Sequence, residues 1–135
     1  MPPKIINDEQ YEFWNEGIGK KWVQEDASMN ERFTILTDEF FSRTMINKDD
    51  SILDIGCGGG ITSYEASKLV GENGYVLGAD ISEILLDLAK KNYSSIKNLE
   101  FKYCDVQNYK FEKKIFNKVI SRFGVMFFEN PIEAF

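Results

Sequence analysis

From about residue 50 onward, short apolar runs alternate with segments whose apolar positions recur at helical spacing. Strands are expected at four apolar or alternating runs, residues 51–55, 75–79, 99–103 and 116–123. Helices are expected over 61–70, which glycines follow, and after Ser82, whose hydroxyl can cap a helix N-terminus. Pro131 is typical of the first turn of another helix.

Strands and helices that alternate in this way are joined by right-handed crossovers and give one parallel sheet. The first two strands are almost wholly apolar, which indicates central positions. In the third, Leu99, Phe101 and Tyr103 alternate with Glu100 and Lys102, as on an edge strand with one wet face. The pattern predicts strand order 3-2-1-4, the first half of a Rossmann-like doubly wound α/β fold. Its ligand site belongs at the carboxyl ends of the strands, near the switch between strands 1 and 4.

The beginning of the chain has a different period. We interpret residues 1–46 as an N-terminal helical cap that precedes a ligand-binding domain at 47–135. Ser28 and Glu31 have capping-box spacing, so a helix is expected over about 29–45. Its buried stripe would consist of Met29, Phe33, Leu36, Phe40 and Phe41.

Composition excludes several classes of function. The 135 residues give room for one domain, and 43% hydrophobic residues suit a packed core. A formal net charge of −6 argues against nucleic acid or anionic membranes as partners, because both attract Lys and Arg. The absence of histidine excludes His-based triads, bases and metal sites, and the spacing of Cys57 and Cys104 predicts neither zinc nor a disulfide framework. No apolar run approaches the ~20 residues of a membrane span, and the first residues lack a secretory signal, so a cytoplasmic location is expected.

A glycine-rich segment, Asp54-Ile55-Gly56-Cys57-Gly58-Gly59-Gly60, connects the first strand to the next helix. Glycines here allow a tight turn and let a ligand approach the backbone at a helix N-terminus. A dinucleotide fingerprint is the main competitor, but Ile61 and Ser63 occupy the places where it needs Gly or Ala. The Asp54 carboxylate would repel a pyrophosphate and attract an ammonium group, unless it only bonds to amides of the turn.

Acidic residues also end the next two strands. Asp80 can accept hydrogen bonds from both hydroxyls of a ribose, or can cap a helix in competition with Ser82. Asp105 can accept from the exocyclic amine of adenine, with the Val106 amide facing a ring nitrogen, or can be a turn residue. Three acids on one rim predict a site for an adenosyl ligand.

These segments resemble the three cofactor motifs of class I S-adenosylmethionine-dependent methyltransferases. The matching segments are 52–60, 78–80 and 104–106, and residues 116–128 are similar to the fourth-strand motif of that family. The resemblance covers roughly residues 46–135. Its overall character is that of the small-molecule branch that includes ubiquinone and menaquinone C-methyltransferases.

The resemblance implies S-adenosylmethionine as the cofactor. The implied binding residues are Asp54, Gly56, Gly58, Gly60, Asp80, Ile81, Asp105, Val106 and Ser121. Of these, the glycines would pass under the cofactor, Asp54 would face its ammonium group directly or through water, and Asp80 would hold its ribose. Asp105 and Val106 would address adenine, and Ser121 would lie near the methionine moiety.

On the acceptor side, the resemblance implies that Arg122 and Phe123 point towards the substrate. Tyr11, Trp14 and Trp22 are candidates to close over the pocket, because aromatic walls suit a sulfonium cation. The alternative is that these rings belong to the core of amphipathic helices.

The implied reaction is direct displacement at the sulfonium methyl by a small-molecule acceptor, which depends on alignment and exclusion of water. No general base is assigned. The family fold commonly has three more strands, so an apolar edge is expected at strand 4, to be covered by a missing C-terminal half or a partner chain. A non-catalytic adenosyl-ligand module and a nicotinamide-dependent oxidoreductase are the alternative functions.

Overall fold

The computed structural model describes residues 7–111, 115–125 and 132. Its strands form one sheet in the order β3-β2-β1-β4, and every neighbouring pair is parallel. The strands are β1 (Ser51–Ile55), β2 (Tyr75–Asp80), β3 (Leu99–Tyr103) and β4 (Lys118–Ile120). This arrangement confirms the predicted fold class and strand order. The helix expected from Pro131 lies outside the described residues, which include only Ile132 of that segment.

Strand β4 is shorter than the predicted run of 116–123. After its last residue, the hydroxyl of Ser121 donates to the carbonyl oxygen of Ile55 at 2.8 Å. A side chain therefore hydrogen-bonds to the last carbonyl group of β1. Phe123 then has a φ of 69°, which turns the chain away from the extended conformation. The strand therefore ends through a side-chain hydrogen bond and one left-handed residue.

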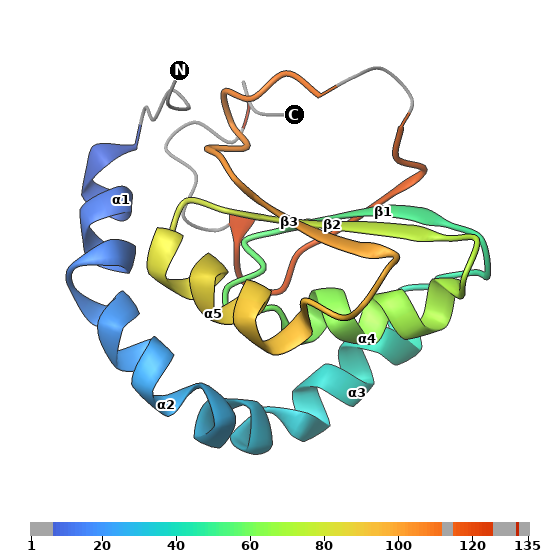
Figure 1. The fold of residues 1–135 in the computed structure, drawn as a ribbon, viewed down its shortest axis with the longest axis horizontal. Helices are drawn as coiled ribbons and strands as arrows, with labels where there is room; N and C mark the ends of the chain where they lie inside the picture. The colour runs from blue at the N-terminus through green and yellow to red at the C-terminus, as the bar shows by residue number, and fades with distance from the viewer. Residues whose placement is uncertain (1–6, 112–114, 126–131, 133–135) are drawn as a thin grey trace.

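The sheet has an apolar core on each face, because side chains alternate along the strands. The crossover helices α4 (Ile61–Val70) and α5 (Glu83–Tyr93) lie on the same face of the sheet (Figure 1). The core beneath them consists of Ile52, Ala66, Val70, Val76, Leu99 and Ile120. The other core consists of Leu53, Ile55, Leu77, Ala79 and Cys104, with Phe111 and Phe116 packed against it.

Three helices precede the sheet and curve around α5 and α4 (Figure 1). They are α1 (Asp8–Asn15), α2 (Ile18–Arg32) and α3 (Thr34–Arg43). The prediction of a single helix over 29–45 is therefore wrong. Ser28 lies inside α2, so the capping box with Glu31 does not begin a helix, and the break comes at Phe33. There the Phe33 ring stacks on Trp22 with centroids 6.4 Å apart, a tertiary contact that the local cap signal does not contain.

The predicted apolar stripe of this region is partly correct, with four of its five residues partly buried and none fully buried. Met29, Phe33, Phe40 and Phe41 are partly buried, but Leu36 is 49% exposed. A break in a helix changes the direction of the faces on either side of it, so one stripe cannot continue through Phe33.

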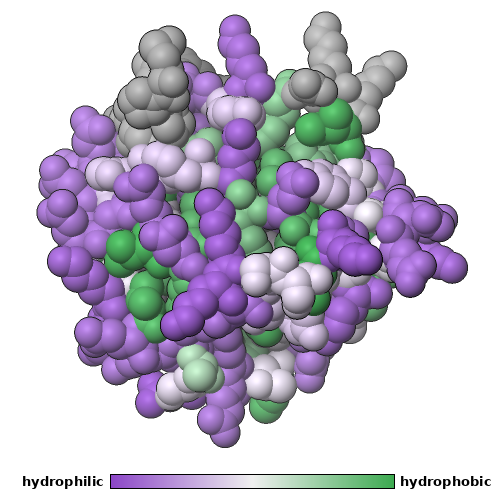
Figure 2. All heavy atoms as spheres, viewed as in Figure 1, coloured by the Kyte–Doolittle hydropathy of each residue, from purple (hydrophilic) through white to green (hydrophobic). Residues whose placement is uncertain are grey.

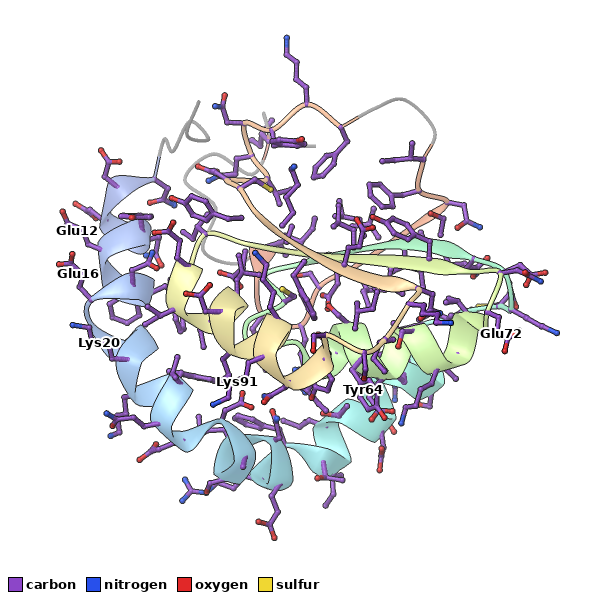
Figure 3. The ribbon with its side chains drawn as sticks, in the orientation of Figure 1. Glu12, Glu16, Lys20, Tyr64, Glu72 and Lys91 are labelled. Carbon is purple, nitrogen blue, oxygen red and sulfur yellow. The ribbon has the colours of Figure 1, made fainter. Side chains whose placement is uncertain are left out.

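Polar side chains cover the outside of the N-terminal helices. Glu12, Glu16 and Lys20 point away from the sheet in Figure 3, and hydrophilic residues cover most of the face seen in Figure 2. The inner side of α2 packs on α5, and α1 also contacts α5. In the part of the chain that the structure describes, no helix has the length and apolar character needed to cross a membrane.

Candidate functional site

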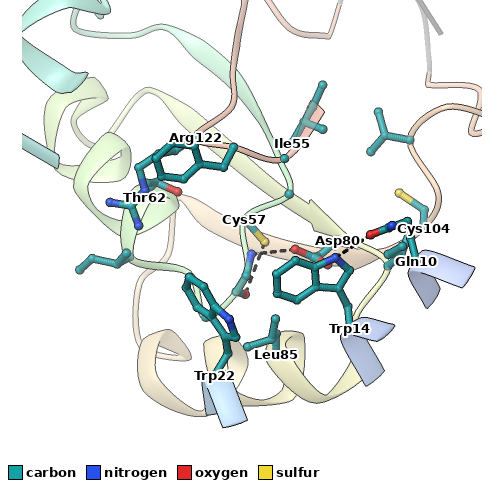
Figure 4. Close-up of a pocket in the computed structure, with 18 of the residues that line it drawn as sticks. Gln10, Trp14, Trp22, Ile55, Cys57, Thr62, Asp80, Leu85, Cys104 and Arg122 are labelled. Atoms are coloured by element: carbon teal, nitrogen blue, oxygen red, sulfur yellow. Dashed lines mark hydrogen bonds between the residues drawn. The ribbon is translucent and has the colours of Figure 1, made fainter. Parts of the chain in front are cut away.

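A pocket opens at the carboxyl ends of the strands, between the sheet and helices α1 and α2 (Figure 4). Its wall combines the segments that follow all four strands with residues of the N-terminal helices. The predicted site residues that line it are Trp14, Gly56, Gly58, Asp80, Ile81, Asp105, Val106, Arg122 and Phe123. Asp54, Gly60 and Ser121 do not line it. Most of the predicted site residues therefore share one hollow at the expected rim.

The glycine turn between β1 and α4 has three residues in the left-handed region: Gly56, Gly58 and Gly60, with φ of 70°, 55° and 94°. A Cβ on Gly56 would lie 2.6 Å from the Cα atom of Gly124, and one on Gly60 would lie 2.9 Å from the Phe101 ring. Gly60 therefore lets α4 begin close to the sheet. At Gly58 a Cβ would meet no atom within 4 Å, so only the backbone conformation favours glycine there.

Asp54, at the end of β1, is fully buried. Its Oδ2 atom accepts hydrogen bonds from the hydroxyls of Thr62 at 2.6 Å and Ser63 at 2.7 Å, which tie β1 to the first turn of α4. Its Oδ1 atom has no hydrogen-bond partner among the described residues. Burial raises the pKa of Asp54 to about 6, and the two hydroxyl donors limit that rise. Hydroxyls, rather than the amides considered from the sequence, hold this carboxylate.

Asp80, at the end of β2, joins the glycine turn to the next helix. Its Oδ2 atom accepts from the Gly58 N–H at 2.8 Å (Figure 4), and its Oδ1 atom accepts from the Ser82 N–H at 2.9 Å. Ser82 itself caps α5, because its hydroxyl oxygen accepts from the Leu85 N–H at 3.3 Å. Burial raises the pKa of Asp80, and the backbone donors oppose the rise. Asp80 thus does not compete for the cap, and each of its oxygens retains a lone pair for a ligand.

Asp105 follows β3 in a turn and is buried. Its Oδ1 atom accepts from the backbone N–H and the side-chain amide of Gln107 at 3.2 and 3.3 Å. Its carbonyl oxygen accepts from the N–H groups of Asn108 and Tyr109. The turn role and the pocket role considered from the sequence are therefore compatible. Gln107 also lines the pocket, and it was not predicted from the sequence because it belongs to no motif.

Ser121 holds two parts of the backbone together behind the pocket wall. Besides donating to the Ile55 carbonyl, its hydroxyl oxygen accepts from the Val125 N–H at 3.2 Å. The neighbouring chain is tightly packed, since a Cβ on Gly124 would lie 2.4 Å from the Ile55 carbonyl oxygen. Both features fix the exit of β4 against the end of β1.

Arg122 and Phe123 reach the pocket from the same segment. The Arg122 guanidinium donates to the Thr37 hydroxyl on α3 and lies over the Phe33 ring, 5.9 Å from its centroid. Its positive charge also lowers the pKa of Asp54. Phe123 is 53% exposed. The two residues expected on the acceptor side therefore lie at the β4 end of the pocket.

Aromatic rings of the N-terminal helices form one side of the pocket. Trp14 and Trp22 both line it and meet edge to face with centroids 5.9 Å apart (Figure 4). Tyr11 does not line it. Its hydroxyl donates to Glu83 at 3.3 Å, and its ring lies 6.4 Å from that of Tyr103. Two of the three rings that were candidates to cover the pocket are thus placed on it.

Helix α2 places two polar residues on the pocket wall that no sequence motif indicates. Asp26 and Asn30 line the pocket one and two turns after Trp22, and Phe33 follows them. Their spacing of four residues is visible in the sequence, but polar residues at helical spacing ordinarily mark a solvated face. Other lining residues outside the predicted set include Asn7, Gln10, Cys57, Gly59, Thr62 and Cys104.

The two cysteines are free and buried. Burial raises the pKa of Cys104 to about 12 and raises the pKa of Cys57 as well. Both thiols therefore stay protonated at neutral pH, where a thiol is a weak nucleophile. Within the described residues, no group of three or more Cys, Asp or Glu side chains is arranged to hold a metal ion.

Comparison with known families identifies the domain. The sequence profile described as "Methyltransferase domain" matches residues 46–134. The chain belongs to this methyltransferase family. That membership confirms the resemblance to class I S-adenosylmethionine-dependent methyltransferases that the motifs indicated.

Relatives and solved structures agree with this assignment. The "Putative methyltransferase 235L" of Invertebrate iridescent virus 6 is 32% identical over 116 residues, which are 84% of this chain and 42% of that protein. The demethylmenaquinone methyltransferase of Staphylococcus aureus is 34% identical over 80 residues, 59% of this chain and 33% of that protein. A SAM-dependent methyltransferase from Aquifex aeolicus has the same fold, with a TM-score of 0.67 at 20% identity over 73% of this chain and 53% of that one. The chain spans less than half the length of the two curated relatives.

Proposed function

We propose that this domain binds S-adenosylmethionine across the rim of its sheet and transfers the methyl group to a small-molecule acceptor. The observation that carries the proposal is that Asp80 and Asp105, from different strands, line one pocket together with the open backbone of Gly56 and Gly58. One carboxylate can accept from ribose hydroxyls and another from the adenine amine. Membership of the methyltransferase family supports the same function.

The residues that line the pocket fit this cofactor. In the proposal, Asp80 and Ile81 hold the ribose, and Asp105 and Val106 hold adenine. The glycine turn lets the ligand approach the backbone at the N-terminus of α4. These four residues and the glycine turn line the same pocket.

Three further predicted residues act from behind the wall of the pocket. Asp54 ties β1 to α4, and because its pKa is about 6 it contributes negative charge near the glycine turn at neutral pH. Gly60 permits the close start of α4, and Ser121 fixes the end of β4. In this proposal they shape the binding surface without touching the ligand.

The chemistry requires alignment more than a resident nucleophile. The bound cofactor supplies an electrophilic methyl carbon, to which an acceptor oxygen, nitrogen or carbon bonds as the bond to sulfur breaks and sulfur keeps the electron pair. The rings of Trp14, Trp22 and Phe33 exclude water and favour a cation beside their π faces. Arg122 and Phe123 border the acceptor.

We further propose that residues 1–46 act as a cap over the binding domain at 47–135. The cap is attached next to the cofactor site: the Ser82 hydroxyl donates to the Trp14 carbonyl at 2.7 Å, and the Asn15 amide donates to the Ile81 carbonyl at 2.9 Å. A pocket closed by helices admits a small molecule more readily than a macromolecule. The net charge of −6 also disfavours a nucleic-acid acceptor.

The outer edge of strand β4 is unpaired among the described residues. Val119 on that edge is 57% exposed. Exposed apolar strand edges are ordinarily covered. We propose that a further part of the protein or a partner chain covers this one.

Calorimetric titration with S-adenosylhomocysteine and, separately, with NAD tests the proposed function. We expect S-adenosylhomocysteine to bind with one site per chain and NAD not to bind. Binding of NAD alone would overturn the proposal in favour of an oxidoreductase. If S-adenosylhomocysteine binds but radiolabelled methyl transfer fails with every small acceptor tried, the chain is a non-catalytic adenosyl-ligand module.

A further inference from the structure

Helix α2 presents a carboxylate to the pocket that no motif predicts. Trp22, Asp26 and Asn30 follow one another at intervals of four residues and all line the pocket, so they share one face of the helix. Asp26 is the one acidic residue that the described part of the N-terminal helices contributes to this wall.

The Asp26 carboxylate lies directly against the glycine turn. A Cβ built on Gly59 would lie 2.3 Å from Oδ1 of Asp26 and 3.1 Å from its Cγ atom. Gly59 is not among the residues in the left-handed region, so its backbone conformation does not require glycine. The space left by the missing side chain is what admits the carboxylate to the turn.

The surroundings of Asp26 suit a cationic partner. Its Oδ2 atom accepts one hydrogen bond, from the Asn30 amide at 3.3 Å, and none of the ion pairs among the described residues includes it. The stacked rings of Trp22 and Phe33 line the same wall. A carboxylate beside aromatic faces is an arrangement that attracts ammonium groups.

We propose that Asp26 binds the α-ammonium group of the cofactor's amino-acid moiety. This inference rests on the proposed function, and it moves the direct contact away from Asp54. Asp54 does not line the pocket and is fully buried, with one oxygen held by two hydroxyls, whereas Asp26 lines the pocket and borders the turn. Cofactor affinity then depends on the N-terminal helices as well as on the sheet.

The test compares two ligands that differ in the amino-acid moiety. S-adenosylhomocysteine carries the α-ammonium group, and 5′-methylthioadenosine has the same nucleoside thioether without it. In the full chain, Asp26→Asn should lower the affinity for S-adenosylhomocysteine by about tenfold to hundredfold, the usual effect of losing a charge-assisted hydrogen bond. The same substitution should leave the affinity for 5′-methylthioadenosine unchanged. Glu25→Gln is the matched control, because Glu25 is the exposed neighbour on the same helix.

A second variant keeps the charge and moves it. Gly59→Ala should displace the Asp26 carboxylate and produce the same selective loss, and the double variant should bind S-adenosylhomocysteine no more weakly than either single variant. If Asp26→Asn does not fold, judged by its thermal transition, Gly59→Ala decides.

The outcomes separate this inference from the function on which it rests. Wild-type chain that fails to bind S-adenosylhomocysteine contradicts the proposed function itself. Unchanged affinity for S-adenosylhomocysteine in the Asp26 and Gly59 variants overturns the inference. Asp26 would then be a candidate to bind a cationic methyl acceptor. An equal loss for both ligands also overturns it, because the helix face would then have only a structural role.

Discussion

The Asp80 carboxylate and the Gly58 amide are joined by a hydrogen bond of 2.8 Å that connects the end of β2 to the turn after β1. The residue expected to bind a ribose therefore also shapes the loop over which the ligand would lie. The same carboxylate accepts from the Ser82 N–H, at the start of α5. Three segments of the rim thus meet at a single side chain.

We predict that Asp80→Ala lowers the affinity for S-adenosylhomocysteine by at least tenfold. The variant loses the acceptors for the ribose hydroxyls and also frees the Gly58 amide, and a hydrogen bond to a charged group ordinarily contributes about 1.5–3 kcal/mol. Titration calorimetry measures the effect. Asp87→Ala is the matched control, since Asp87 is exposed on α5. Unchanged affinity in Asp80→Ala would refute the ribose role.

We predict that Asn15→Ala loosens the N-terminal cap. The buried Asn15 amide donates to the carbonyl oxygens of Ile81 at 2.9 Å and Tyr11 at 2.8 Å, and its Oδ1 atom accepts from the Glu83 N–H at 2.7 Å. Leaving these groups without partners costs about 1–3 kcal/mol. Hydrogen exchange should therefore accelerate in α1 and at the start of α5, while β1 and β2 stay protected. Glu12→Ala, at an exposed position of α1, is the control, and equal exchange in both variants would contradict the prediction.

We predict that Asp54 makes the protein less stable as pH rises. Burial raises the pKa of Asp54 from 3.8 to about 6, so the folded chain holds a proton that the unfolded chain has released. Its contribution to stability is fully present below about pH 4 and is lost as pH rises through 6. The shift corresponds to about 3 kcal/mol.

Urea unfolding of wild type and Asp54→Asn across this pH range measures that contribution. Relative to Asp54→Asn, wild type should lose about 3 kcal/mol between about pH 4 and pH 7. Asp38→Asn, at an exposed position of α3, is the control variant. A difference between wild type and Asp54→Asn that does not vary with pH would show that Asp54 ionises normally in the folded chain.

We predict that Gly124→Ala destabilises the fold more than Gly58→Ala. A Cβ on Gly124 would lie 2.4 Å from the Ile55 carbonyl oxygen and 2.9 Å from the Gly56 Cα atom, and backbone must move to make room. Overpacking of this kind ordinarily costs about 1–3 kcal/mol. At Gly58 only the left-handed conformation opposes a side chain, at about 1–2 kcal/mol. Thermal unfolding of the two variants gives the comparison, and the reverse order would show that the segment after β4 yields easily.

The parallel sheet could be predicted because its signals are local. Ser51–Ile55 and Tyr75–Asp80 are almost wholly apolar, which is the mark of a strand covered on both faces, and the alternation in Leu99–Tyr103 indicates an edge. The left-handed turn at Gly56, Gly58 and Gly60 is also local, since glycine adopts that conformation readily. These features follow from how each residue relates to its near neighbours.

Tertiary packing decided what those patterns left open. Asp54 is held by hydroxyls eight and nine residues later, Ser121 bonds to Ile55, and Phe33 interrupts a predicted helix where its ring meets Trp22. Asp26 looks like an ordinary solvated residue until α2 is packed on α5, which brings its carboxylate to Gly59. The sequence alone determined the order of the strands, the glycine-rich turn and the acids at the ends of the first three strands. Only the tertiary structure decided that Thr62 and Ser63 hold Asp54 and that Gly58 donates to Asp80, because hydrogen bonding of a buried carboxylate is settled by whichever donors the folded core places beside it.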